Sequence, residues 1–190
     1  MASDALDAGQ LDKYATDAQA WRDFAEINYA ASALLFGSDR PFLWFAAATL
    51  GHQALEMFLK AALIREGMTV FNPKNISKAN PVMALKSEDC VWGHKLLNLA
   101  QTLGRKRPEF NLSAVIRTPH YFAAESMFLT VERGFEIFDP FFTELRYPTE
   151  LTNVECLGPE HKIILEELVS RLRPISGVRA RSGKPPFGIP

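Results

Sequence analysis

One uninterrupted helical stretch constrains the fold of this chain more than any other feature. Residues 42–66 (FLWFAAATLGHQALEMFLKAALIRE) contain no proline and a single glycine, Gly51, and they are rich in the strong helix formers Ala, Leu and Met. Apolar residues recur along the stretch at alternating steps of four and three, which is typical of one helical face. Other apolar residues fill most of the remaining circumference. The sequence therefore predicts a helix that is buried on several sides.

A narrow polar stripe crosses this apolar helix. It contains His52 or Gln53, then Glu56, then Lys60, and Glu before Lys at this spacing is the favourable order for an ion pair. An exposed pair of this kind contributes only about 0.3–0.5 kcal/mol, so stability alone does not explain it. Two interpretations stay open: a solvated edge of a core helix, or a polar seam that faces a partner or ligand.

Composition narrows the class of protein. The chain has 190 residues, which fits one domain, and its net charge of −1 gives no global basic field of the kind that nucleic-acid binders carry. Cys90 and Cys156 lack CxxC spacing, which argues against a disulfide scaffold or a zinc finger and favours reduced thiols in a cytoplasmic protein. The N-terminus shows no signal peptide, and the longest apolar run, residues 41–51, is too short to span a bilayer.

The pattern along the chain predicts an all-α, up-down bundle of four to five helices, with a long loop between helices two and three. A first helix covers residues 11–36 and ends at Gly37, and Ser38 or Asp39 is expected to cap the second helix ahead of Pro41. These two helices should form a tight antiparallel hairpin. Residues 68–91 contain two Asn-Pro steps and predict a long surface loop.

The remaining helices are predicted by similar signals. A third runs from Gly93 to Gly104, and the basic triplet 105–107 follows it, either as a partner of the helix dipole or as a phosphate-contacting patch. A fourth starts at Thr118-Pro119 and continues to Phe138, although residues 127–138 could instead form a hairpin around Gly134.

Asp139-Pro140 then begins a new helical segment or kinks the existing one, and that segment continues to Arg146. The last helix runs from Gly158-Pro159 to Pro174. We therefore predict a flexible N-terminus at residues 1–10, one helical domain at 11–173, and a flexible Pro/Gly/basic tail at 174–190.

Common catalytic motifs are missing from the sequence. None of the four histidines stands in an HExxH pair, so we expect neither a metal nor a cofactor. No GxSxG elbow and no GxGxxG loop after a strand is present.

Three phrases carry a family resemblance. QALEMFLKAALIREG, followed by a loop and GHKLLNLAQTL, resembles the second and third helices of HEPN domains (higher eukaryotes and prokaryotes nucleotide-binding), and FDPFFTELRYP resembles a helix-end segment of the same family. The resemblance covers roughly residues 20–173. It implies a small helical bundle tied to nucleotide or RNA biology.

The resemblance also bears on catalysis. Catalytic family members resemble one another in an Arg-x-x-x-x-His motif, brought together across a dimer for metal-independent RNA cleavage, in which histidine acts as general acid or base. Arg146 stands where the motif arginine is expected, but the position five residues on is Leu151. None of the histidines has an arginine five residues before it. The resemblance therefore implies a copy without the ribonuclease pair, and we expect no enzymatic activity.

A ligand site remains the alternative use of these residues. The candidate ligand-binding residues are Arg146, Tyr147, Lys60, Glu56, His94 and Lys95. Arg146 offers a permanently charged fork for phosphate or carboxylate, and Tyr147 adds an aromatic ring beside it. A structural interpretation is also open. In it, Arg146 forms an ion pair with Glu56 or Glu144 that joins helix two to helix four, and His94 is only a residue at a helix N-terminus.

Three hypotheses follow. The first is a non-catalytic HEPN-like homodimer that binds a nucleotide, RNA or a partner protein such as a nucleotidyltransferase-like antitoxin, in a toxin–antitoxin or defence system, with a dimer surface on helices two and four. The second is a ribonuclease with a substituted site, for example Arg146 with His94 or His120. The third is a purely structural interaction module whose polar seam sets partner register.

Overall fold

The computed structural model describes residues 15–72, 86–116, 129–143 and 157–177. Within them the chain forms a helical bundle with one very small parallel sheet, which confirms the predicted all-α class. The elements are α2 (Ala18–Phe36), α3 (Leu43–Arg65), β1 (Thr69–Val70), the short 3₁₀ helix η3 (Ser87–Asp89), β2 (Cys90–Val91), α4 (Leu96–Lys106), α5 (Val131–Phe138), α6 (Pro140–Thr143) and α7 (Pro159–Ile175).

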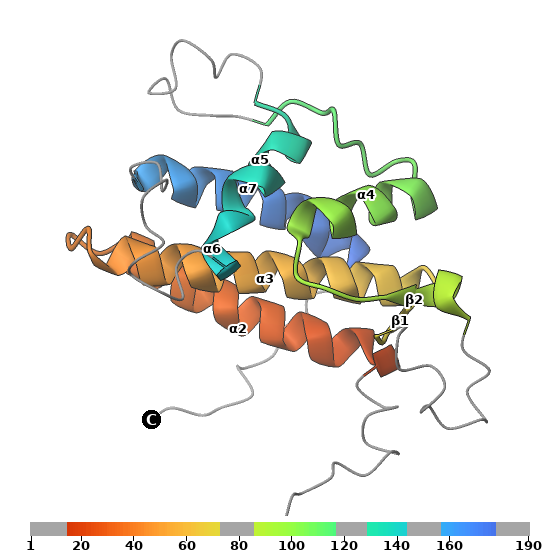
Figure 1. Ribbon diagram of the computed structural model, residues 1–190. Coiled ribbons are helices and arrows are strands. Elements are labelled where there is room, and N and C mark those ends of the chain that lie inside the picture. The colour runs from red at the N-terminus through yellow and green to blue at the C-terminus, as the bar shows by residue number, and fades with distance from the viewer. Residues whose placement is uncertain (1–14, 73–85, 117–128, 144–156, 178–190) are drawn as a thin grey trace, which may run out of the picture.

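Helix α3 is the central element of the bundle. Figure 1 shows α2 along one side of it and α4 to α7 on the other, and α3 contacts α2, α4, α5, α6 and α7. Its side chains from Ala54 to Leu63 are almost all buried, so the predicted burial on several sides is confirmed. Gly51 permits a close approach of other helices: a Cβ there would lie 3.0 Å from the Phe138 ring and 3.1 Å from Leu165.

Helices α2 and α3 form the predicted hairpin, but the expected cap of α3 is wrong. The residue that precedes α3 is Phe42, and neither Ser38 nor Asp39 caps the helix with its side chain. The first amides of α3 are instead satisfied by backbone, because Leu43 N donates to Arg40 O at 2.9 Å. A turn that already satisfies these amides needs no side-chain cap.

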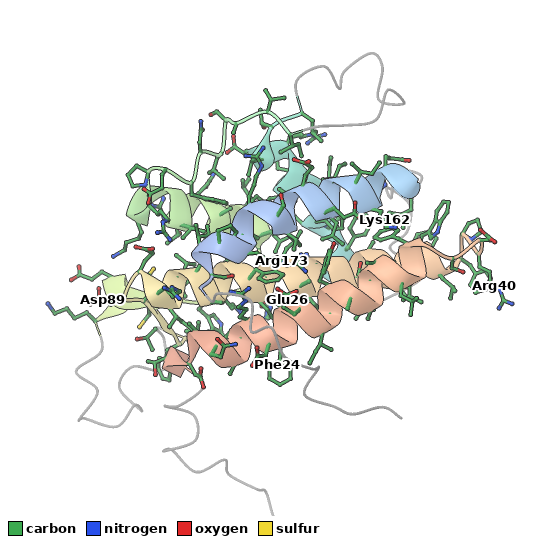
Figure 2. The ribbon with its side chains drawn as sticks, turned by 180° about the vertical axis from the view of Figure 1, so that it is seen from behind. Phe24, Glu26, Arg40, Asp89, Lys162 and Arg173 are labelled. Atoms are coloured by element: carbon green, nitrogen blue, oxygen red, sulfur yellow. The ribbon has the colours of Figure 1, made fainter. Side chains whose placement is uncertain are left out.

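Helix α2 is also tied to α7, far away in the sequence. Arg173 forms a two-pronged contact with Glu26, with its Nη2 2.7 Å from Oε2 and its Nε 3.0 Å from Oε1. The Arg173 guanidinium also lies 4.7 Å from the centre of the Tyr29 ring. Figure 2 shows the labelled Glu26 and Arg173 between the two helices.

The prediction of a plain surface loop at residues 68–91 is wrong at both ends of that segment. Strands β1 and β2 pair in parallel, with Thr69 opposite Cys90 and Val70 opposite Val91. Val70 and Val91 are buried together with Met68, so this pairing places apolar side chains over one end of the core. Residues 73–85 lie outside the described part of the chain.

Helix α4 begins and ends later than predicted. Gly93, with φ of +106°, lies in the turn ahead of the helix, and Gly104 lies inside it. Arg105 and Lys106 occupy the last turn, as the dipole interpretation expects. Arg107 pairs with Glu66 at 3.1 Å and with Glu109 at 2.9 Å.

Of residues 127–138 the structure describes 129–138, and the helical alternative is correct for Val131–Phe138. The hairpin around Gly134 is wrong because Gly134 lies inside α5. Leu129 and Thr130 precede the helix, and Thr130 forms an antiparallel bridge with Val115. The Thr130 side chain accepts a hydrogen bond from Arg133 N, so it caps α5. Residues 117–128, where this helix was expected to start, lie outside the described ranges.

Helix α6 starts at Pro140, directly after the last turn of α5, in agreement with the predicted segment boundary at Asp139-Pro140. Helix α7 confirms the predicted last helix, and Ser176 and Gly177 after it are buried. Of the predicted flexible termini, residues 1–10 and 178–190 are not among those described. Among the described helices, none combines the length and apolar character that crossing a bilayer requires.

Candidate functional site

The polar stripe of α3 is buried, so its interpretation as a solvated edge is wrong. His52 is fully buried, and Glu56 and Lys60 are only 6% and 3% exposed. Their four-residue spacing places them on one face of α3, where residues from other elements cover them. Charged side chains are almost never buried to this extent unless they are paired.

Lys60 is paired on two sides. Its Nζ donates to Glu56 Oε1 at 2.6 Å. The same ammonium group lies 5.0 Å from the ring centre of Trp21, on α2, and 5.9 Å from that of Trp92, which follows β2. The faces of aromatic rings attract cations, and Trp does so most strongly. The ammonium is therefore stabilised by one carboxylate and two indole rings.

His94 approaches the same carboxylate from the segment between β2 and α4. Its Nδ1 lies 3.1 Å from both Oε1 and Oε2 of Glu56, and its side chain remains 49% exposed. The structure thus brings together three of the predicted site residues, Glu56, Lys60 and His94. His94 is not merely a residue at a helix N-terminus, because it binds a buried anion of another helix.

His52 completes the cluster on the inner side. Its Nδ1 is 2.8 Å from the carbonyl oxygen of Phe138, and its Nε2 is 3.7 Å from Glu56 Oε2. A carbonyl oxygen only accepts hydrogen bonds, so Nδ1 carries a proton. His52, rather than Gln53, is therefore the first member of the stripe.

The surroundings of Glu56 keep its carboxyl group ionised. Burial alone would raise its pKa, but the interaction with His52, the charge and hydrogen bond of Lys60 and the hydrogen bond of His94 outweigh burial. Together they lower the pKa of Glu56 from 4.5 to about 2. A carboxylate of such low basicity is a poor proton acceptor near neutral pH.

The junction of α5 and α6 holds both sides of the cluster. The carbonyl of Phe138 accepts from His52, and the next side chain, that of Asp139, accepts from the backbone N–H of Leu96 at the start of α4. The two residues Phe138 and Asp139 thereby hold His52 and the first turn of α4 in place. This role gives a physical reason for the Asp139-Pro140 step, which the sequence indicated only as a boundary.

Of the other predicted site residues, the structure describes only Lys95, and it does not join the cluster. Lys95 is exposed and precedes α4 without forming a side-chain cap. Arg146 and Tyr147 lie outside the described ranges, as do Glu144 and His120, so the predicted ties of Arg146 stay predictions. Among the described residues, no three His, Cys, Asp or Glu side chains are placed to hold a metal ion.

Sequence reasoning missed Trp21, Trp92 and Asp139. Trp92 stands two residues before His94 and next to the predicted start of helix three, so its position could have suggested a role beside the histidine. Trp21 and Asp139 gave no such signal, because only the packing of α2 and of the α5–α6 junction against α3 brings them close.

The fold and the site define a helical bundle with a buried ionic cluster on its central helix. No protein-family model matches the sequence, and comparison with curated proteins and with solved structures gave no significant match.

Proposed function

We propose that this protein is a non-catalytic HEPN-like helical module that forms a homodimer in the cytoplasm and binds a nucleotide or RNA. A partner protein, such as a nucleotidyltransferase-like antitoxin in a toxin–antitoxin or defence system, belongs to the same proposal. The resemblance supports it, since QALEMFLKAALIREG and GHKLLNLAQTL correspond to the neighbouring helices α3 and α4. Glu56 and His94, one from each phrase, are in direct contact.

The observation that carries this proposal is the state of Glu56. A general base works best when its pKa is near the operating pH. Glu56 has a pKa of about 2, and its carboxylate is bound by Lys60 and His94. The charges at the centre of the bundle are thus arranged to hold segments together, which favours a binding module over an enzyme.

Exposed apolar side chains on α2 support self-association. Phe24, Ile27 and Leu34 are all exposed, and their spacing of three and seven places them on one helical face. Figure 2 shows the labelled Phe24 on the side of α2 that faces away from α3. The sequence predicted the dimer surface on helices two and four. Helix α3 is enclosed from Ala54 to Leu63, and most of the predicted helix four lies outside the described residues. We therefore assign the dimer surface to α2.

Two measurements test the proposal. Light scattering after size exclusion should give twice 21.3 kDa, and replacing Phe24 and Leu34 with Glu should return the monomer mass. Titration of labelled single-stranded RNA and of nucleotides over a salt series should show saturable binding, weaker in Arg146→Ala. A wild-type monomer at micromolar concentration would contradict the dimer. Unmeasurable affinity for every nucleotide and RNA would remove the nucleic-acid part.

One observation favours a second candidate, a ribonuclease with a substituted site. His94 is half-exposed, and a carboxylate orients its Nδ1, as in hydrolases where an acidic side chain orients the catalytic histidine. RNA cleavage in the presence of EDTA tests this candidate. The ribonuclease candidate predicts cleavage products from the wild type that are absent with the His94→Ala, His120→Ala double variant. Equal cleavage by both proteins would exclude this candidate.

A further inference from the structure

We infer that Trp92, His94 and Lys95 form a contact site for a single nucleotide unit, in which the indole ring stacks on a base and the imidazole and ammonium groups bind the adjacent phosphate. The inference rests on the proposed nucleotide or RNA binding and names the residues that perform it. It does not use Arg146.

The three side chains present the chemistry that single-stranded nucleic acid requires. Trp92 is 55% exposed, His94 is half-exposed, and Lys95 is exposed. Proteins that bind unpaired bases stack them on aromatic rings and place cations along the phosphates. In this protein both features fall within four consecutive residues at the junction of β2 and α4.

The buried cluster fixes the relative positions of these side chains. Trp92 lies against Lys60, His94 binds Glu56, and Lys60 and Glu56 are joined at 2.6 Å. The exposed indole and the exposed imidazole are therefore both anchored to one buried ion pair. Side chains that are already immobilised lose less conformational entropy when a ligand binds.

The backbone of the segment is also constrained. Gly93, between the two anchored residues, has a φ of +106°, a conformation that side-chain-bearing residues rarely adopt. The first N–H of α4, that of Leu96, is held by Asp139. This amide is therefore not available to a phosphate, and we assign the phosphate contact to the exposed side chains of His94 and Lys95.

Acidic neighbours limit the size of the site. Glu88 and Asp89 form most of η3, directly before β2, and would repel a longer phosphate backbone. We therefore expect a footprint of one base and one phosphate rather than an extended track. For one phosphate on a single strand, the logarithm of the binding constant should fall with the logarithm of salt concentration with a slope of about −0.7.

The experiment measures affinity for two probes, a labelled single-stranded RNA octamer and a nucleoside monophosphate. The test variants are Trp92→Leu and Lys95→Ala. Their matched controls are Phe42→Leu, another exposed aromatic residue, and Arg40→Ala, an exposed cation in the connection between α2 and α3. We expect Trp92→Leu to weaken binding of both probes at least fivefold, since stacking contributes about 1–3 kcal/mol per base. Lys95→Ala should weaken binding and remove most of the salt slope, and both controls should change affinity less than twofold.

The outcomes separate the site from the proposed function. If RNA binds the wild type, Trp92→Leu and Lys95→Ala equally well, this site is wrong although the protein binds nucleic acid. If neither probe binds the wild type, both the nucleic-acid function and the site are wrong. If the octamer binds and the monophosphate does not, the single-nucleotide footprint is overturned. Lys95 is exposed and forms no ion pair with another described residue, so Lys95→Ala keeps the test decisive if Trp92→Leu fails to fold.

Discussion

Lys60 carries an ammonium group into the interior of a helical bundle. Removing an ion from water costs several kcal/mol, and a buried pair recovers this cost only when its geometry is good. Lys60 meets that condition with a 2.6 Å contact to Glu56 and two indole rings within 6 Å of Nζ. Because Lys60 and Glu56 are both buried, each charge is stabilised only while the other is present.

A lysine-to-methionine change tests this dependence. Lys60→Met leaves the Glu56 carboxylate buried without its closest partner, and breaking a buried pair in this way costs about 3–5 kcal/mol. Denaturant unfolding should show this loss in the free energy of unfolding. The double variant Lys60→Met, Glu56→Gln removes both charges and should recover at least half of it. A single variant within about 0.5 kcal/mol of the wild type would show that the pair is not coupled.

The low pKa of Glu56 makes stability depend on acidity. Because its folded pKa of about 2 lies below the value of 4.5 expected when unfolded, Glu56 stabilises the fold above pH 4.5. This contribution is lost as pH falls from 4.5 through 2, and the shift corresponds to about 3 kcal/mol. Acid titration of unfolding should therefore destabilise the wild type by about that much more than Glu56→Gln. Parallel acid profiles for the two proteins would contradict the assigned cause.

At the residue scale the sequence predicted the pair but not its burial. The i,i+4 order of Glu56 and Lys60 is visible in the sequence, and so is their position on an apolar helix. The side chains that cover them are Trp21, Trp92 and His94. All three are distant in the sequence, and the smallest separation is the 32 residues between Lys60 and Trp92. Periodicity within one helix contains no information about such neighbours.

Two glycines inside helices differ in what surrounds them. A Cβ at Gly51 would meet Phe138, Leu165 and Ser32 at 3.0, 3.1 and 3.3 Å, whereas a Cβ at Gly104 would meet nothing closer than the Phe110 carbonyl oxygen at 3.5 Å. The missing side chain at Gly51 therefore permits three other elements to approach α3. At Gly104 an ordinary van der Waals contact would result.

Alanine substitution should separate the two positions. Replacing a helical glycine by alanine gains up to about 1 kcal/mol, and overpacking a core costs about 1–3 kcal/mol. Gly104→Ala should therefore raise the free energy of unfolding by up to about 1 kcal/mol, while Gly51→Ala should lower it by a similar amount. Thermal or denaturant unfolding of both variants checks the opposite signs. Stabilisation by Gly51→Ala would show that the neighbouring helices move apart easily.

At the element scale, long periodic segments were predictable and short pairings were not. The sequence gives α3 and α7 nearly to the residue, because each has a sustained apolar face and a clear boundary. It did not indicate β1 and β2, which have two residues each and are defined by their partners rather than by any local pattern. The same reason explains the error at Thr130, where the bridge to Val115 interrupts an apparently continuous helical stripe.

The whole molecule is organised around α3, and its stability should be distributed accordingly. Local opening costs least where backbone is exposed and most where it is enclosed. The segment from Ala54 to Leu63 is buried from nearly all directions, while α2 presents one open face. Hydrogen exchange should therefore show the slowest amides in the middle of α3, with rates set by global unfolding. Slower exchange in α2 or α7 than in α3 would contradict this organisation.

The parallel pairing of β1 with β2 has a consequence for the tolerance of the chain to change. The chain leaves the core after Val70 and re-enters it at Val91, which lies opposite Val70 in the pairing. Both ends of the intervening length are thus fixed, and doubling the length of a closed loop costs only about 0.6 kcal/mol. We therefore expect that residues inserted between β1 and β2 lower the free energy of unfolding of the bundle only slightly.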